Sequence, residues 1–203
     1  LVRVGCGLVG GRAQVEEEHR RDVTLLAPAA GVQLRGDRLP RAPLEVRAVE
    51  AFRQETAAVA FYNRPSPDGS RPGIFYVNLA DMNQVLKPQV DAIAHHEGAP
   101  GHHFQIALAQ ELQNMPKFRR FGGYGAYAEG WGLYAERLAA EQGWYDGDPA
   151  GLLGQLDMAL FRAHRLVIDT GIHAKHWTRQ QALDYLGPLP GLSPESEIDR
   201  YVT

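Results

Sequence analysis

Hydrophobic residues follow different periods in different parts of the chain. The apolar run 73–79, GIFYVNL, is rich in aromatic and β-branched residues and predicts a β-strand. The preceding stretch 63–73 contains three prolines and an Asp-Gly pair, which predicts a turn-rich loop. From residue 87 onward, apolar positions recur at helical spacing, so most of the remaining chain is expected to be helical.

Start and stop signals delimit these helices. Lys87 and Pro88 form a plausible helix start, because proline is tolerated at the first helical position. Further helices are predicted at 126–143, 151–177, 178–187 and 193–203. Thr178 and Gln181 form a capping-box pattern, and Ser193 is a typical N-cap. The last helix has no stop signal, so we expect the sequence to be part of a longer protein.

The N-terminal part of the chain gives weaker signals. Residues 1–45 are rich in Gly, Arg and Pro, so we expect an irregular segment there, with a charged surface helix at 13–27. The stretch 42–62 mixes strand and helix signals and gives no assignment. Residues 46–203 are expected to carry the chemistry. The predicted class is mainly α with a small β-sheet edge, α+β.

Composition narrows the class of protein. The chain has 203 residues, 44% hydrophobic and 22% charged, which suits a soluble globular protein. A formal net charge of −3 gives no basic footprint, so no nucleic-acid partner is expected. The single Cys6 excludes an internal disulfide. No apolar run reaches the roughly 18 residues of a membrane span. The compartment, cytoplasmic or exported, and the oligomeric state stay open.

The stretch 95–103, HHEGAPGHH, holds half of the eight histidines. Imidazole nitrogens and carboxylate oxygens are preferred zinc ligands. The common helical motif places two histidines four positions apart, with a glutamate after the first as general base. His96 and Glu97 supply the first half of this motif, but the next histidines are His102 and His103.

Pro100 and Gly101 account for the longer spacing. On a regular helix, the sixth position after His96 is turned by about 240°, and the seventh lies about 10 Å further along. Pro100 cannot donate to the His96 carbonyl, and Gly101 permits an unusual backbone angle. We therefore expect a two-residue bulge that brings His102 to the metal, with His103 as the alternative ligand. A turn of solvated histidines is the structural alternative.

The helix 126–143 offers a third ligand. Glu129 and Glu136 are seven positions apart and lie on one helix face, among aromatic residues. Buried carboxylates need a partner. Gly130 and Gly132 would let this helix approach another closely. We expect Glu129 to be the third ligand and Glu136 to orient a ligand histidine. Ordinary surface acids are the alternative.

The helix 151–177 carries a polar stripe within an arc of about 80°. Its members are Arg162, Arg165, Asp169, His173 and His176. Arg162 or Arg165 would clamp a substrate carboxylate, and His173 would donate to an oxyanion. A structural ion-pair network, chiefly Arg165 with Asp169, explains the stripe equally well.

Four stretches, DGSRPGIFYVNL, HEGAPGHH, AEGWGLYAE and RLVIDTGIH, together resemble the bacterial family catalogued as domain of unknown function 885, over residues 40–203. That family is similar in turn to the gluzincin metallopeptidases, whose zinc ligands are two motif histidines and a glutamate on a later helix. The resemblance implies a zincin-like helical catalytic region. It implies His96, His102 and Glu129 as ligands of one zinc ion, with Glu97 as general base.

The resemblance also implies a place for the substrate. The strand 73–79 would be the edge strand beside the cleft and would pair with an extended peptide. Tyr76 and Asn78 are accordingly placed among the substrate-binding residues. Family members are longer, and a segment beyond Thr203 carries a tyrosine that could assist catalysis.

The predicted function is zinc-dependent peptide hydrolysis. Zinc would polarise the scissile carbonyl, and Glu97 would take a proton from water and pass it to the leaving amine. Arg165 and His173 would position the substrate or stabilise the oxyanion. Two alternatives remain: a non-catalytic metal-containing module that binds peptides or a partner protein, and a His/Glu iron site for redox chemistry.

Overall fold

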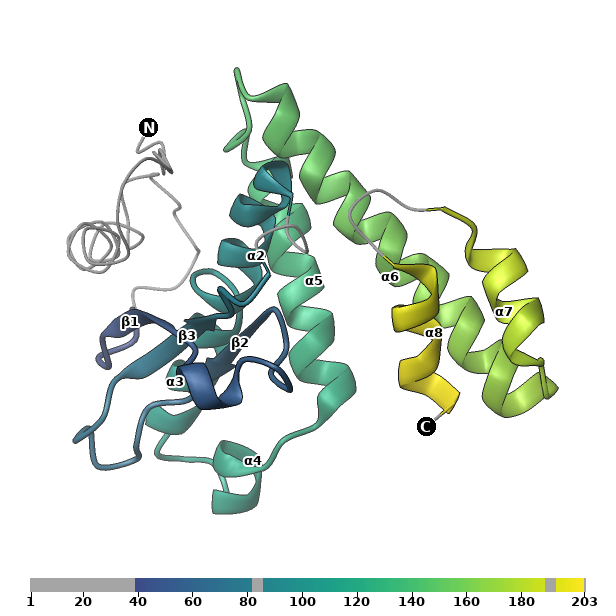
Figure 1. The fold of residues 1–203 in the computed structure, drawn as a ribbon. Coiled ribbons are helices and arrows are strands. Elements are labelled where there is room, and N and C mark those ends of the chain that lie inside the picture. The colour runs from purple at the N-terminus through teal and green to yellow at the C-terminus, as the bar shows by residue number, and fades with distance from the viewer. Residues whose placement is uncertain (1–38, 82–85, 189–192, 203) are drawn as a thin grey trace. The chain divides into compact units, whose positions relative to one another are not determined.

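The structure of the chain is a computed structural model in which helices predominate and one small sheet is present (Figure 1). It describes residues 39–81, 86–188 and 193–202. The helix expected at 13–27 lies outside this part. The chain divides into two compact units, residues 1–80 with 93–147 and residues 81–92 with 148–203. Each unit is described by itself. No helix in the described residues is long and apolar enough to cross a membrane.

A three-stranded sheet belongs to the first unit. Its strands are β1 (Leu44–Ala48), β2 (Ala60–Asn63) and β3 (Gly73–Val77), in the order β1-β3-β2. β1 is parallel to β3, and β2 is antiparallel to it. The strand expected at 73–79 is confirmed, but its expected edge position is wrong because β3 is central.

β3 is central because the stretch 42–62 supplies a strand on each side of it. Four of the five β3 residues are buried, and a continuous apolar run is typical of a strand covered on both faces. β1 and β2 are short and less buried, with mixed composition. Their strand signal is therefore weak in the sequence.

Different residues pack on the two faces of the sheet. Ile74 and Tyr76 form a small core with Val49 on one face, where Phe61 also packs. On the other face, Gly73 lies against His103 and the Tyr62 hydroxyl. A Cβ at Gly73 would lie 2.5 Å from His103 Nδ1, so glycine allows this close approach.

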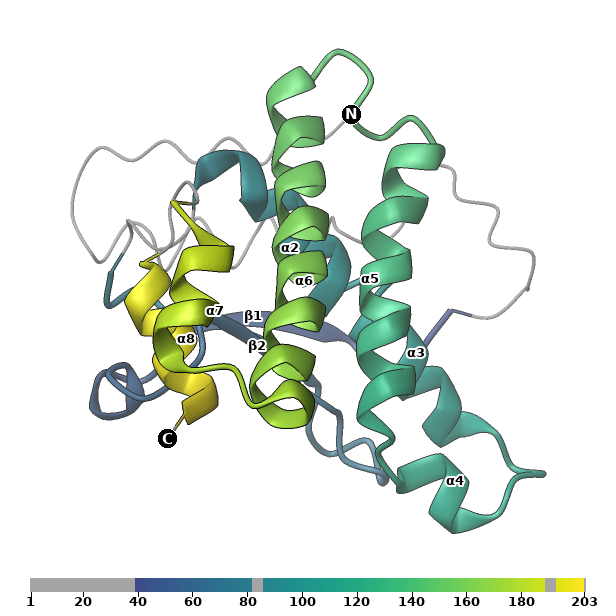
Figure 2. The same cartoon turned by 90° about the vertical axis from the view of Figure 1, so that its right-hand side faces the viewer.

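The helices of the first unit follow the sheet in sequence. They are α2 (Val90–Glu97), which belongs to this unit from residue 93 onward, α3 (His102–Glu111), α4 (Lys117–Phe121) and α5 (Gly125–Glu141). α3 and α5 contact one another (Figure 2). The 3₁₀ turn η4 (Lys87–Gln89) leads into α2, which confirms the predicted helix start. α5 confirms the helix predicted at 126–143, whereas α4 was not predicted.

The second unit is helical. It contains α6 (Pro149–Lys175), α7 (Arg179–Leu186) and α8 (Pro194–Val202). These helices enclose a core of Ile168, Ala182, Leu186 and Ile198. The predicted capping box is present, because the Thr178 side chain accepts from the Gln181 N–H and the Gln181 side chain binds the cap backbone.

Candidate metal centre

A turn separates α2 from α3. α2 ends at Glu97, α3 begins at His102, and the Ala99–Pro100 peptide bond is cis. A Cβ at Gly101 would lie 1.9 Å from the His96 carbonyl oxygen, so only glycine fits this approach of the two helices. The predicted interruption is confirmed, but it is a turn between two helices rather than a bulge within one.

The turn brings His96 and His102 together. Their ring centroids are 4.6 Å apart at an interplanar angle of 81°. Both side chains are buried, with 4% and 7% of the residue exposed. Two histidines that a regular helix would turn away from one another therefore present their rings to the same point.

Glu129 of α5 completes a group of three possible ligands. Its Oε2 lies 3.3 Å from His96 Nε2, and its Oε1 lies 3.5 Å from His102 Nε2. A tetrahedral zinc site with bonds of about 2.0–2.1 Å separates its donors by about 3.3–3.4 Å. The two contacts use different oxygens of Glu129, and one donor atom from each residue lies within 4.8 Å of the other two. The residues present therefore fit a zinc ion in donor chemistry and lie close together.

The electrostatics of this group favour an ionised carboxylate. Hydrogen bonds from His102 and His96 hold the pKa of the Glu129 carboxyl well below its ordinary value. The Glu129 side chain is 68% exposed, whereas both histidines are buried. The group is thus reached from solvent on the Glu129 side.

A second carboxylate holds His96 in place. Glu136 is fully buried, and its Oε1 lies 2.7 Å from His96 Nδ1. With a metal ion bound, a proton on Nδ1 shared with this carboxylate would leave the Nε2 lone pair for the ion. The expected contact of Glu136 with a ligand histidine is present in the structure.

Gly132 makes room for this arrangement. A Cβ there would lie 2.4 Å from His96 Cε1. Gly130 differs, because a Cβ at this position meets nothing within 4 Å among the described residues. Only one of the two glycines expected to permit close approach therefore does so.

The other two histidines of 95–103 have protein partners. His103 Nδ1 lies 3.0 Å from the Tyr62 hydroxyl oxygen, and a backbone hydrogen bond with Ala42 also engages the ring. His95 Nδ1 lies 3.1 Å from the Tyr145 hydroxyl oxygen. Burial lowers the pKa of His103, and lowers that of His95 to about 4. The structure thus groups His102, rather than His103, with His96 and Glu129.

Glu97 follows His96 at the end of α2 and is itself buried. Its assigned role as general base remains a prediction. Trp131 was not predicted to take part, yet its indole N–H donates to the Pro100 carbonyl at 2.7 Å and ties the turn to α5. Its position between Gly130 and Gly132 was the only sequence signal for this contact.

Tyr76 and Asn78 are not brought to the candidate metal-ligand group of His96, His102 and Glu129. The Tyr76 ring stacks on Phe61 with centroids 4.9 Å apart, on the sheet face opposite Tyr62 and His103. The Asn78 side-chain amide donates to backbone carbonyl oxygens of Gln54 and Ala57. Through these contacts, both residues have a structural role in the fold.

The polar stripe of α6 belongs to the second unit. Arg165 Nε donates to the Tyr201 hydroxyl at 2.8 Å and lies 3.0 Å from Glu197 Oε1. Glu197 is buried, and neither α8 residue was anticipated as a partner. Asp169 instead lies 3.7 Å from His173, and both are exposed. The catalytic and substrate-binding roles of Arg165, His173 and Arg162 remain predictions.

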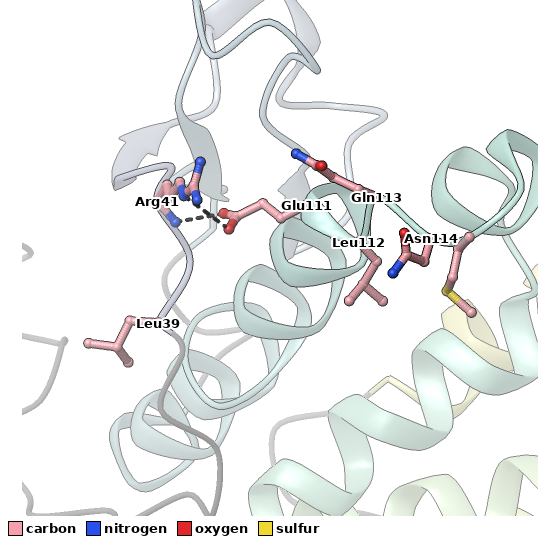
Figure 3. A pocket seen from close by; sticks show the side chains of 7 residues that line it. Leu39, Arg41, Glu111, Leu112, Gln113 and Asn114 are labelled. Carbon is pink, nitrogen blue, oxygen red and sulfur yellow. Dashed lines mark hydrogen bonds and ion pairs between the residues drawn. The ribbon is translucent and has the colours of Figure 1, made fainter.

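A pocket of about 480 Å³ lies at the other end of α3 from His102 (Figure 3). It is lined by Leu39, Arg41, Glu111, Leu112, Gln113, Asn114 and Met115. The Arg41 backbone N–H donates to Glu111 Oε1 at 2.7 Å. Arg41, Gln113 and Asn114 are exposed and Glu111 is partly exposed, so the lining of the pocket has no buried polar side chain that would fix a ligand.

Comparison with known proteins defines the family. The model described as "Bacterial protein of unknown function (DUF885)" matches residues 9–203, and the chain belongs to this family. A crystal structure titled "putative lipoprotein from Colwellia psychrerythraea" is 44% identical, with a TM-score of 0.76, over 81% of this chain and 28% of that one. No curated protein sequence matches the chain.

A second solved structure supports the fold alone. It is titled as a "putative lipoprotein of unknown function from Shewanella oneidensis" and is 22% identical, with a TM-score of 0.60. The match covers 80% of this chain and 30% of that one. The chain thus spans less than a third of each solved relative. These comparisons support the DUF885 family and not the further likeness to gluzincins.

Proposed function

We propose that this chain carries the metal site of a zinc-dependent peptide hydrolase. The observation that carries the proposal is the group formed by His96, His102 and Glu129, whose donor atoms all lie within 4.8 Å of one another. Two imidazoles and one carboxylate are a donor set known from catalytic zinc sites, which keep a further position for water or substrate. A bound zinc ion would supply Lewis acidity to a carbonyl group and to water.

Glu97 is the proposed general base. It directly follows a proposed ligand, so its side chain leaves α2 about 100° away from that of His96. A buried carboxylate beside the ligands can take a proton from the attacking water and deliver it to the leaving amine. Glu129 would thus bind the ion, and Glu97 would move the proton.

The outer edge of β2 offers a place for an extended peptide. The Asn78 N–H donates to the Val59 carbonyl at 2.8 Å, and Ala60 lies opposite Val77 in the register. Hydrogen-bonded and non-bonded pairs alternate along antiparallel strands. The main-chain groups of Ala60 and Tyr62 therefore point away from β3, where they can pair with a further strand.

This edge lies near the metal ligands. The Tyr62 ring centroid is 6.5 Å from that of His102, and its hydroxyl contacts His103. A peptide paired with β2 would thus run close to the proposed site. The peptide-binding strand is accordingly β2 in this proposal, in place of the strand 73–79.

Two His and one carboxylate also suit non-haem iron, so the donor set alone does not decide the reaction. The adjacent buried Glu97 and the neighbouring strand edge favour hydrolysis of a peptide. We also infer an exported location, because both solved relatives are described as putative lipoproteins.

The test combines metal identification with a hydrolysis screen. The purified chain is analysed for bound metals and then incubated with a mixed peptide library followed by mass spectrometry. One zinc ion per chain with new peptide ends supports the proposal. Bound iron with oxygen consumption, or zinc with peptide binding but no cleavage in the family's full-length protein, would overturn it.

A further inference from the structure

Gly130 is a glycine that the described structure does not require. It lies inside α5, where glycine is less favourable than alanine because it loses more conformational freedom. Its φ is not in the left-handed region, and a Cβ there meets no described atom within 4 Å. Gly132 of the same helix shows the contrast, because the His96 ring fills the space beside it.

The position of Gly130 suggests why a side chain is missing. It directly follows Glu129, whose carboxylate oxygens face both ligand histidines and whose side chain is 68% exposed. The metal-ligand group therefore opens to solvent along this flank of α5. Gly130 is itself exposed, so α5 offers bare backbone beside the open side of the group.

We propose that Gly130 lies on the path by which a peptide substrate reaches the metal, where its missing side chain lets the substrate main chain pass against α5. This inference depends on the proposed function. It makes Gly130 a residue that leaves room for the substrate near the scissile bond. A side chain at this position would leave the ligands intact and narrow the approach.

The test separates access to the metal from metal binding. The zinc-loaded chain is titrated with acetohydroxamate, a small zinc ligand, and with an N-acetyl-dipeptide hydroxamate, which carries a peptide chain to the same ion. The variants are Gly130→Ala and Gly130→Val. The control is Gly123→Ala, because Gly123 also has open space for a Cβ but lies before α5.

The proposal expects all variants to bind acetohydroxamate as the unchanged chain does. The affinity for the dipeptide hydroxamate should fall roughly tenfold in Gly130→Ala and further in Gly130→Val, since the added side-chain atoms would overpack the contact with the ligand. Gly123→Ala should change neither affinity. The melting temperature of Gly130→Ala should rise, because alanine favours the helix.

Two results would overturn the inference. Unchanged dipeptide hydroxamate affinity in both Gly130 variants would mean that the substrate does not pass this position. A lower melting temperature in Gly130→Ala would mean that another segment packs there. Failure of the proposed function looks different: the unchanged chain would bind neither zinc nor acetohydroxamate, and the Gly130 inference would fall with it.

Discussion

At the scale of the residue, three glutamates near His96 have different surroundings. Glu129 is exposed and faces two imidazoles, Glu136 is fully buried against His96 Nδ1, and Glu97 is buried beside His96 in sequence. These surroundings suit a ligand, an orienting partner and a base, respectively. The helical spacing of Glu129 and Glu136 predicted their common face. The Tyr62–His103 contact joins residues 41 positions apart, which no local pattern reveals.

Glu97→Gln tests the base. The amide keeps the volume of the side chain but removes the basic oxygen, so metal binding should survive. Peptide hydrolysis should fall by about 10²–10⁴-fold, the usual contribution of a general base. The rate is measured in the family's full-length protein, with zinc content measured in parallel. Loss of zinc in this variant would show that Glu97 is a ligand instead.

Glu136→Gln tests the orienting partner. Glutamine still accepts a hydrogen bond from His96 Nδ1–H but carries no charge, so the fold should persist and zinc affinity should fall about 10–100-fold. Competition with a chelator of known affinity measures this change. Glu141→Gln is the control, because Glu141 lies on the same helix but pairs with the exposed Arg137. Equal affinities in the two variants would exclude an orienting role for Glu136.

At the scale of the element, the turn between α2 and α3 defines the site. The sequence predicted this interruption because a proline within a helix removes a hydrogen bond at a known place. It did not predict β1 and β2, whose few residues gain their strand conformation by pairing with the central β3. Such pairing depends on residues distant in sequence, so it overrides weak local preference.

Replacing Pro100 and Gly101 together with alanines tests the turn. The new Cβ at position 101 would collide with the His96 carbonyl, and the restored N–H at position 100 would favour a continuous helix. His102 should then turn away from His96 and Glu129. We expect helix content to be kept or raised and zinc binding to be lost. Zinc affinity equal to that of the unchanged chain would contradict the account of the turn.

At the scale of the whole molecule, the chain consists of two units, and the metal-ligand group lies entirely in the first. The polar stripe of α6 was predicted from helical spacing alone. Helical spacing predicts which residues share a face of α6, but it does not predict their partners. In the structure, the partners of Arg165 are Glu197 and Tyr201. These contacts indicate that Arg165 has a structural role in the second unit.

Arg165→Met tests that role. Without the guanidinium, the buried Glu197 loses a partner, so the free energy of unfolding should fall by about 1–3 kcal/mol. Zinc affinity should stay unchanged. Urea unfolding and a zinc titration measure the two quantities. Unchanged stability together with a large loss of hydrolysis in the full-length protein would instead support the predicted substrate contact.

The most direct measurement is the zinc content of a matched pair of histidine variants. His102→Gln and His103→Gln change neighbouring buried histidines to the same residue, and only His102 belongs to the proposed ligand group. After dialysis against zinc and then buffer, the unchanged chain and His103→Gln should each retain one zinc ion, whereas His102→Gln should retain none. Zinc kept by folded His102→Gln, or absent from the unchanged chain, would contradict the proposed site.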